Sequence, residues 1–386
     1  MSGAATLERR YLGAIFSELC AIESPSLSER ACAERVIAEL AALGVEVQED
    51  GAGQLIGSDC GNLLARMPGA GTDGGSPLLL CAHLDTVPLQ APVEPVLVDG
   101  GWENANEGIL GADNKAAVAV LLALARHVNG LGSPVDIELL FTVGEEISLA
   151  GSAEFDASRL RSEFGYVFDH ASAIGEVIMG SPTHFRLEAS FRGAAAHAGI
   201  RPEDGRSAIL AAARAITAIP QGRLDEDTTV NVGTIAGGTA LNVVPERCSL
   251  VAEVRAMDDE RAETLVAEIV DRINEAANRP DCDCDVEVIA QRTFAGYALP
   301  GGSRAVRVAE GALRACGYEP QRVRSGGGSD ANALIAQGFP TVNLANGTER
   351  NHEPGERVSV AALEGMLDVA LALLDQAAAL APGAGL

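Results

Sequence analysis

The chain contains the stretch Pro77-Leu78-Leu79-Leu80-Cys81-Ala82-His83-Leu84-Asp85, in which an unbroken apolar run ends in a histidine and an aspartate. Such a run is typical of a strand that is buried on both faces of a mostly parallel sheet. In an extended segment His83 and Asp85 lie on one face, so Asp85 could hold the second ring nitrogen of the imidazole. Taken alone, a histidine after a strand is more often a hydrogen-bonded surface residue.

Three further apolar runs end in the same manner. They are Val135 to Val143 before Glu145 and Glu146, Tyr166 to Phe168 before Asp169, and Gly338 to Leu344 before the loop that holds His352. Ligands of open α/β sheets bind beyond the carboxyl ends of the strands. We therefore predict an α/β domain with a mostly parallel sheet, and we expect these polar side chains to meet at one edge of it.

The pattern changes between Pro182 and Gln291. Alternating strands are expected at 185–192, 228–236, 247–255 and 286–289, and amphipathic helices at 207–219 and 259–278. This order is the split βαβ pattern of a ferredoxin-like domain. We expect a catalytic domain over 1–181 and 295–386, with an inserted α+β lid over 182–294. The edge strands and exposed helix of the lid could pair across a twofold axis, which would give a homodimer.

Composition excludes several classes of function. The 386 residues carry 28 Lys and Arg against 54 Asp and Glu, and the resulting net charge of −26 repels nucleic-acid phosphates. The longest apolar run, 116–125, is too short to span a bilayer, and 1–10 lacks the pattern of a signal peptide, so we expect a cytoplasmic protein without membrane or nucleic-acid partners. The eight cysteines form no CxxC pair.

Five of the residues near strand ends could hold metal ions: His83, Asp113, Glu146, Asp169 and His352. Nitrogen and oxygen ligands without thiolate suit Zn²⁺, Mn²⁺ or Co²⁺. If one carboxylate bridges two ions, five ligands give each ion three protein contacts and leave room for water. Two ions about 3.5–4 Å apart can act together on one carbonyl group.

Asp113 is the natural bridge, because it directly precedes the apolar helix expected over 116–128. The simpler reading of Asp113 is a helix N-cap. Glu145 and Glu146 follow a buried strand, where adjacent side chains point to opposite sides. One can therefore ligate a metal while the other reaches a water, with Glu146 as ligand and Glu145 as general base. The simpler reading of this pair is a solvated turn.

These residues lie in motifs that resemble those of the co-catalytic di-zinc peptidases. The motifs are Cys81-Ala82-His83-Leu84-Asp85-Thr86-Val87-Pro88, Leu110-Gly111-Ala112-Asp113-Asn114-Lys115-Ala116, Val143-Gly144-Glu145-Glu146, Phe168-Asp169 and Asn351-His352-Glu353. The superfamily includes peptidase T, carnosinase, aminoacylase and succinyl-diaminopimelate desuccinylase, and the likeness is greatest to peptidase T-like proteins. It extends over nearly the whole chain.

The resemblance implies a role for each residue of the motifs. One zinc ion would take His83, Asp113 and Asp169, and the other Asp113, Glu146 and His352; manganese or cobalt could substitute. Glu145 would be the general base toward a metal-bridged water, and Asp85 the partner of His83. A cis peptide bond is expected between Asp113 and Asn114.

Further substrate contacts are implied in the lid and in a late loop. His197, within Gly193-Ala194-Ala195-Ala196-His197-Ala198-Gly199, resembles a histidine that polarises the scissile carbonyl and, in dimeric relatives, reaches the partner subunit's site. Asn242 and Arg255 resemble residues that grip the carbonyl or carboxylate of the substrate. Gly328 and Ser329 resemble part of a glycine-rich substrate loop. By their residue types alone, Asn242 could be a turn residue and Arg255 an exposed charge.

The function implied is metal-dependent hydrolysis of a peptide bond in short peptides. Within the family, aspartate at the position of Asp169 is typical of aminopeptidases and dipeptidases, which favours a tripeptidase-like aminopeptidase. Two alternatives stay open. One is an N-acyl amino-acid amidohydrolase with the same metal pair, and the other is a non-catalytic relative that binds peptides.

Overall fold

The computed structural model describes residues 3–69 and 77–379, and the chain divides into two compact units. Unit 1 comprises Met1–Gly180 and Ala298–Leu386, and unit 2 comprises Ser181–Tyr297. The second unit is thus inserted into the first at two nearby strand ends. No helix in the described ranges combines the length and the hydropathy that a membrane crossing requires.

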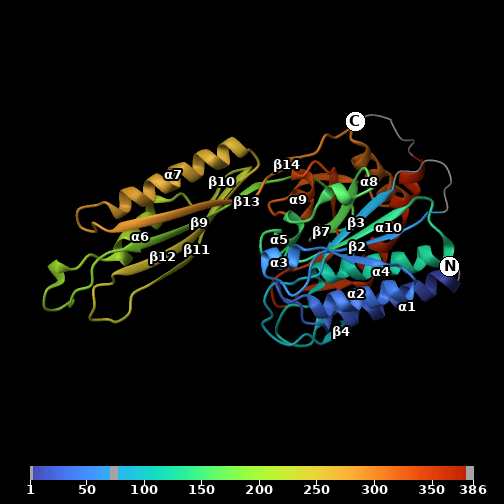
Figure 1. The fold of residues 1–386 in the computed structure, drawn as a ribbon, viewed down its shortest axis with the longest axis horizontal. Helices are drawn as coiled ribbons and strands as arrows, with labels where there is room; N and C mark the ends of the chain where they lie inside the picture. Colours follow the sequence, from blue (N-terminus) through green and yellow to red (C-terminus); the bar gives the residue numbers. More distant parts are fainter. Residues whose placement is uncertain (1–2, 70–76, 380–386) are drawn as a thin grey trace. The chain divides into compact units, whose positions relative to one another are not determined.

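Unit 1 is built on a nine-stranded sheet with four parallel strands at its centre (Figure 1). In spatial order these are β6 (Ile137–Thr142), β3 (Leu78–His83), β7 (Gly165–His170) and β16 (Thr341–Ala345). The marginal strands are β1 (Val47–Glu49), β2 (Leu63–Met67), β8 (Glu176–Ser181), β14 (Tyr297–Ala298) and β15 (Gln321–Arg324). The predicted mostly parallel α/β architecture is therefore confirmed, and the four runs read from the sequence are its four central strands.

Helices cover both faces of this sheet. Helix α4 (Ala112–Leu131) packs on β3 and β7 and contacts α1 (Gly3–Cys20), α2 (Arg30–Ala42) and α10 (Val360–Ala379). Figure 1 shows α9 (Asp330–Ala336) on the opposite side of the sheet, where it packs on β3, β7 and β16. Helix α4 is apolar all round between 116 and 125 and every one of these residues is buried, as expected for a helix enclosed by other helices and a sheet.

Shorter elements complete unit 1. They are α3 (Ala52–Ile56), α5 (Ala150–Ala153), α8 (Arg304–Ala315), the 3₁₀ turn η1 (Ala157–Arg159), and a small sheet with the order β17 (Thr348–Glu349), β18 (Arg357–Ser359), β5 (Gly101–Asn104) and β4 (Pro95–Val98). The loop between β17 and β18 carries His352. The small sheet therefore fixes the base of that loop.

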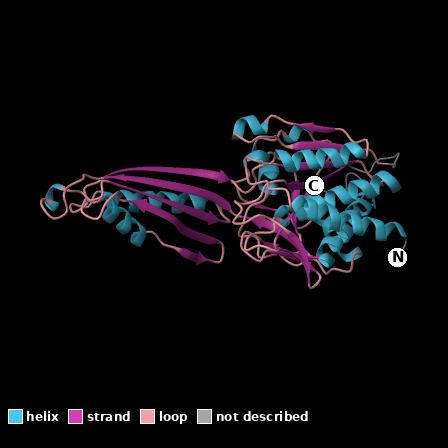
Figure 2. Cartoon of the chain, turned by 90° about the horizontal axis from the view of Figure 1, so that it is seen from below, coloured by secondary structure: helices cyan, strands magenta, loops and turns pink. Residues whose placement is uncertain are grey.

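Unit 2 is an antiparallel sheet with two helices on one face (Figure 2). The strand order is β10 (Gly222–Asp225), β11 (Thr228–Gly237), β12 (Arg247–Ala256), β9 (Thr183–Arg192) and β13 (Asp285–Phe294), and the helices are α6 (Ala208–Ala218) and α7 (Asp259–Ala277). A short 3₁₀ turn, η2 (Pro202–Asp204), precedes α6.

Two details of unit 2 differ from the sequence-based expectation. Strand β10 was not anticipated, because its four residues are almost wholly exposed and show no apolar alternation. Strand β13 is ten residues long, whereas only 286–289 were expected, because its second half from 289 is largely exposed and polar. In both cases backbone pairing with a neighbouring strand, not burial of an apolar face, makes the strand.

A half-buried ion-pair cluster in unit 2 gives a test of this part of the fold. Glu253 accepts from His184 Nε2 at 3.0 Å and from Arg255 at 3.1 Å, and these two partners lower the pKa of Glu253 to about 2, against the cost of burial. A carboxylate whose pKa is lower in the folded than in the unfolded state stabilises the fold at pH values above its unfolded pKa, which is near 4.3. This contribution is lost as the pH falls toward the folded pKa of about 2.

We predict that Glu253→Gln destabilises the protein at pH 7 by about 1 kcal/mol, a figure reduced for screening by solvent. The difference from wild type should shrink as the pH is lowered from about 4.5 toward 2. Thermal unfolding over this pH range measures it. Glu188→Gln is the matched control, since Glu188 pairs with Arg186 on the exposed surface of the same sheet and should change little. A pH-independent Glu253→Gln effect would contradict the prediction.

Candidate metal centre and active site

The five side chains expected to ligate metal lie together at the carboxyl edge of the central sheet of unit 1. His83 and Asp169 stand at the ends of β3 and β7, and Glu146 follows β6. Asp113 lies in the first turn of α4, and His352 in the loop between β17 and β18. Residues separated by up to 269 positions in the chain thus converge at one place.

The ligand atoms form two groups of three. His83 Nε2 lies 3.4 Å from Asp113 Oδ1 and 3.7 Å from Asp169 Oδ1. His352 Nε2 lies 3.1 Å from Asp113 Oδ2 and 2.9 Å from Glu146 Oε1. In each group all the ligand atoms lie within 4.8 Å of one another. Asp113 belongs to both groups and presents one oxygen to each, which is the arrangement of a bridging carboxylate.

The backbone around Asp113 orients its carboxylate. Asp113 and Asn114 have non-helical dihedral angles although they lie in the first turn of α4, and the peptide bond between them is cis. Gly111 precedes them with φ of +74°, a conformation that glycine adopts without strain. The N-cap position of α4 is occupied by Gly111, and the Asp113 carboxylate accepts from Asn351 Nδ2 at 2.8 Å. The simpler reading of Asp113 as an N-cap is therefore wrong.

His83 is oriented by a hydrogen bond at Nδ1, which donates to the backbone carbonyl oxygen of Asp85 at 3.0 Å. Its Nε2 faces Asp113 and Asp169. Against the effect of burial, these carboxylates raise the pKa of His83 well above its usual range, so a metal ion at Nε2 would take the place of a proton. The hydrogen bond at Nδ1 is the usual way in which a second partner prepares an imidazole for a metal ion.

The carboxylate of Asp85 has a wider role than the sequence indicated. It is fully buried and accepts from the backbone amides of Glu145 at 3.0 Å and Glu146 at 3.1 Å, and from the hydroxyl of Ser26 at 2.7 Å. It therefore holds the turn that carries both glutamates. The Glu145 carboxylate lies within 4.8 Å of ligand atoms of His83 and Glu146, close enough to reach a water between them.

Two more buried glutamates hold the loops of the site. Glu29 accepts from the amide of Gly144 at 3.0 Å and from the hydroxyl of Ser58 at 2.7 Å. Glu356 accepts from the amides of Leu110, Gly111 and Asp113. Sequence reasoning gave neither residue a role, although the family pattern has a glutamate near the position of Glu356, because partners that are mainly backbone amides leave no pattern in the side chains.

Charge in the site is unbalanced. Burial, together with the carboxylate of Asp113, raises the pKa of Asp169 to about 7. Burial and the neighbouring Asp169 raise the pKa of Glu145 well above its usual range. Contacts with Asp113 and Glu146 raise the pKa of His352 to about 10. Each shift reports the same condition: several carboxylates crowd around two imidazoles.

This condition fits a pair of divalent cations. Asp113 Oδ1 is buried and accepts no well-aligned hydrogen bond from any described residue, and the nearest donor of an ion pair to Glu146 Oε1 is the imidazole of His352. Unpaired buried carboxylate oxygens are costly unless a cation compensates them. The donor set of imidazole nitrogen and carboxylate oxygen suits zinc, manganese or cobalt.

The expected lid residues lie in unit 2. His197 pairs with Val243 in an isolated β-bridge, and the amide of Ala198 donates to the carbonyl oxygen of Asn242 at 3.0 Å, so the two loops lie side by side. His197 Nδ1 accepts from the amide of Gly199 at 3.2 Å. The proton of the neutral ring is therefore on Nε2, where it can be donated to a carbonyl oxygen.

Arg255 is not brought together with these loops. It lies at the far end of β12 from the Asn242 turn, roughly 25 Å along the strand at about 3.4 Å per residue, and its guanidinium pairs with Glu253. In unit 1, Ser329 forms a capping box with Asn332 at the start of α9. The hydroxyl of Ser329 is thus already used within the fold.

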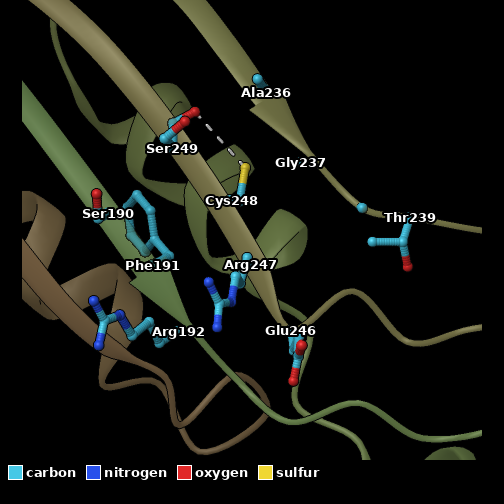
Figure 3. A pocket seen from close by; sticks show the side chains of 11 residues that line it. Ser190, Phe191, Arg192, Ala236, Gly237, Thr239, Glu246, Arg247, Cys248 and Ser249 are labelled. Carbon is cyan, nitrogen blue, oxygen red and sulfur yellow. Dashed lines mark hydrogen bonds between the residues drawn. The ribbon is translucent and has the colours of Figure 1, made fainter.

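A groove of about 320 Å³ lies over the end of β9, β11 and β12 in unit 2 (Figure 3). Its lining includes Arg192 and Arg247, which are direct cross-strand neighbours. None of the residues predicted for the site lines it. This groove therefore does not coincide with the predicted metal ligands or substrate-binding residues.

Comparison with known proteins identifies the family of the chain. The family model of the peptidase dimerisation domain of M20 peptidases matches residues 182–280, and that of peptidase family M28 matches residues 62–201. The solved structure of aminopeptidase PepT from Bacillus cereus is 33% identical, with a TM-score of 0.83, and the match covers 96% of this chain and 99% of that one. The chain belongs to the peptidase T-like family of M20 metallopeptidases.

Other relatives of this peptidase T-like protein carry different names. A tripeptidase structure from Staphylococcus aureus is 31% identical, with a TM-score of 0.88 and coverage of 96% of this chain and 99% of that one. The uncharacterized protein YqjE of Bacillus subtilis is 34% identical over 94% of this chain and 97% of its own. A probable carboxypeptidase of Paracoccidioides brasiliensis is 32% identical over 70% of this chain and 68% of its own.

Because Asp113 belongs to both ligand groups, a substitution of Asp113 tests the proposed metal site directly. We predict that Zn²⁺ raises the melting temperature of the metal-free protein, because ions that bind only the folded state stabilise it by about 2.7 kcal/mol at 100 times Kd. Asp113→Asn should remove most of this shift, since Asp113 belongs to both ligand groups. Glu107→Gln, an exposed change in the preceding loop, serves as control. An undiminished zinc shift in Asp113→Asn would contradict the bridging role.

Proposed function

We propose that this peptidase T-like protein removes the N-terminal residue of short peptides, chiefly tripeptides, with two Zn²⁺ ions, for which Mn²⁺ or Co²⁺ could substitute. One observation carries the proposal: two ligand groups share Asp113, and the Glu145 carboxylate lies beside them. One ion would be held by His83, Asp113 and Asp169, and the other by Asp113, Glu146 and His352. The aminopeptidase and tripeptidase named among its relatives support the choice of substrate.

Held by these two ligand groups, divalent cations would supply Lewis acidity that polarises the peptide carbonyl and lowers the pKa of the attacking water. The protein's own part in the reaction begins with Glu145, which takes a proton from the attacking water and passes it to the leaving amine. Asp85 holds the Glu145 turn by two backbone amides, so the base keeps its position during the transfer.

The lid residues would act on the substrate rather than on the water. His197 would donate its Nε2 proton to the carbonyl oxygen, where negative charge develops in the transition state. Asn242 would contact the same part of the peptide, as their adjacent loops allow. Arg255 would contact a substrate carboxylate, but the length of β12 separates it from His197. A single lid cannot bring both to one tripeptide, so the two residues would serve different substrate molecules.

The alternative is an N-acyl amino-acid amidohydrolase that uses the same ions and the same base. The two reactions differ in what occupies the N-terminal side of the scissile bond, a free amine or an acyl group. The relative named as a probable carboxypeptidase gives a third specificity that the same catalytic groups would support.

A panel of blocked and unblocked peptides tests the proposal. We predict that the zinc-loaded enzyme cleaves a free tripeptide and its C-terminal amide at the first bond, and cleaves the N-acetylated tripeptide at least 100-fold more slowly. Glu145→Gln should lower kcat by 10²- to 10⁴-fold while both zinc ions stay bound. Preference for the acetylated peptide would favour the amidohydrolase, and near-normal turnover of Glu145→Gln would remove Glu145 from the mechanism.

We further propose a homodimer through unit 2. Strand β10 pairs with β11 only at residues 228–230, so the edge of β11 from 231 to 237 is open within the described part of the chain. Ile235 on this strand is 49% exposed, and Ile209 and Leu210 on the adjacent helix α6 are also exposed. An open strand edge beside exposed apolar side chains can pair with the same edge of a second copy. The match to a peptidase dimerisation domain supports this surface.

We predict that Ile235→Glu converts the dimer to a monomer, because it places like charges opposite or near each other across a twofold axis. Sedimentation velocity measures the change. Ile289→Glu is the matched control, since Ile289 is similarly exposed at 57% but lies on β13, at the other edge of the sheet. A dimer that persists in Ile235→Glu and dissociates in Ile289→Glu would move the interface to the β13 edge.

The location in the cell is part of the same proposal. We propose a cytoplasmic enzyme, as expected from the sequence. A relative from Escherichia coli, 30% identical over 191 residues, is named a cytosol non-specific dipeptidase.

A further inference from the structure

Glu356 occupies an unusual position for a charged residue. Its side chain is 1% exposed, and it lies in the loop between β17 and β18, four positions after His352. Its Oε2 accepts from the amides of Leu110 and Gly111, both at 2.8 Å, and its Oε1 accepts from the amide of Asp113 at 2.9 Å. Both carboxylate oxygens are thus committed to the turn that carries Asp113.

This turn needs an acceptor from outside. The first amides of a helix have no partner within the helix, and here Gly111, Asp113 and Asn114 depart from helical dihedral angles. A single buried carboxylate satisfies three of the amides at once. Because a carboxylate has two oxygens in a fixed plane, the contacts also define where the turn lies relative to the loop of Glu356.

The same loop carries a proposed metal ligand. His352 and Glu356 lie on one short segment, and Asn351 donates from Nδ2 to Asp113 Oδ2 at 2.8 Å. One loop therefore supplies His352, fixes the side chain of Asp113 through Asn351 and fixes its backbone through Glu356. A displacement of the Asp113 turn would change the spacing between two ligands of one ion.

We propose that Glu356 is a positioning residue of the dinuclear site: it sets the bridging carboxylate of Asp113 relative to His352 and so determines the affinity for the ion that these two hold with Glu146. The inference rests on the proposed metal site, and it does not require that the substrate be a peptide. It assigns the loop between β17 and β18 a second role besides supplying a ligand.

Glu356→Gln tests the inference, because glutamine keeps the shape and replaces one oxygen by an NH₂ group. The remaining oxygen can serve either Asp113 or the amides of Leu110 and Gly111, while the NH₂ group faces a donor on the other side. We expect one of the two Zn²⁺ ions to bind about 10- to 100-fold more weakly, the range usual for loss of a residue that supports a ligand. Competition with a chromophoric chelator measures the affinity.

The visible absorption of the Co²⁺-loaded protein gives a second readout, since it reports the geometry at the ion and not the stability of the fold. We expect this spectrum to change in Glu356→Gln and to be unchanged in Glu349→Gln, an exposed control on β17. Wild-type zinc affinity and an unchanged cobalt spectrum in Glu356→Gln would overturn the inference, even if the melting temperature fell. If Glu356→Gln does not fold, Glu356→Asp, which keeps the charge but shortens the reach, is measured in the same way.

These outcomes are separate from the failure of the proposed function. A wild-type protein that binds two ions and cleaves no peptide would refute the function and leave the role of Glu356 open to the same measurements. A wild-type protein that does not bind two ions would refute the metal site, and the positioning role of Glu356 with it.

Discussion

The structure depends on one electrostatic constraint, which is that carboxylates buried at the carboxyl edge of the sheet require positive charge. Asp113, Glu145, Glu146 and Asp169 surround the ring nitrogens of His83 and His352. Two imidazoles cannot balance four carboxylates, and the raised pKa of Asp169 and of Glu145 reports the resulting repulsion. A pair of divalent cations would satisfy this constraint, and the shared carboxylate of Asp113 would place them side by side.

A second layer of acidic residues holds the site through the backbone. Asp85 binds the amides of Glu145 and Glu146, Glu29 binds the amide of Gly144, and Glu356 binds the turn of Asp113. These three are buried, yet their oxygens are occupied by hydrogen-bond donors, which lowers the cost of burying the charge. The two sets differ in their partners: one set of carboxylates faces the ring nitrogens of His83 and His352, and the other binds mainly backbone amides.

Much of the site could be predicted because its residues terminate apolar runs. The runs ending at His83, Glu146 and Asp169 became β3, β6 and β7, and parallel strands bring their carboxyl ends to one edge. The resemblance to a family added the pairing of ligands around Asp113. The roles of Glu356 and Glu29 were beyond such reasoning, because a carboxylate that binds backbone amides leaves no spacing rule in the sequence. The hydrogen bond from Gly199 to His197 was hidden for the same reason.

In unit 2, the sequence failed to predict some strands for a different reason. Helices α6 and α7 and strands β9 and β12 follow their apolar periodicity closely, because each buries one face in the same core. Strand β10 and the second half of β13 bury little, so their pairing is decided by neighbouring strands that the local sequence does not reveal. The position of Arg255 was not predictable in the same way. Its resemblance to a substrate-binding arginine did not indicate that the length of β12 would separate it from His197.

Whether Asp113 is shared by two ions can be measured by anomalous diffraction at the zinc edge from crystals grown with Zn²⁺. We expect two peaks about 3.5–4 Å apart, one next to His83 and Asp169 and the other next to Glu146 and His352, with the Asp113 carboxylate between them. A single peak, or two peaks that do not both contact Asp113, would contradict the sharing of Asp113.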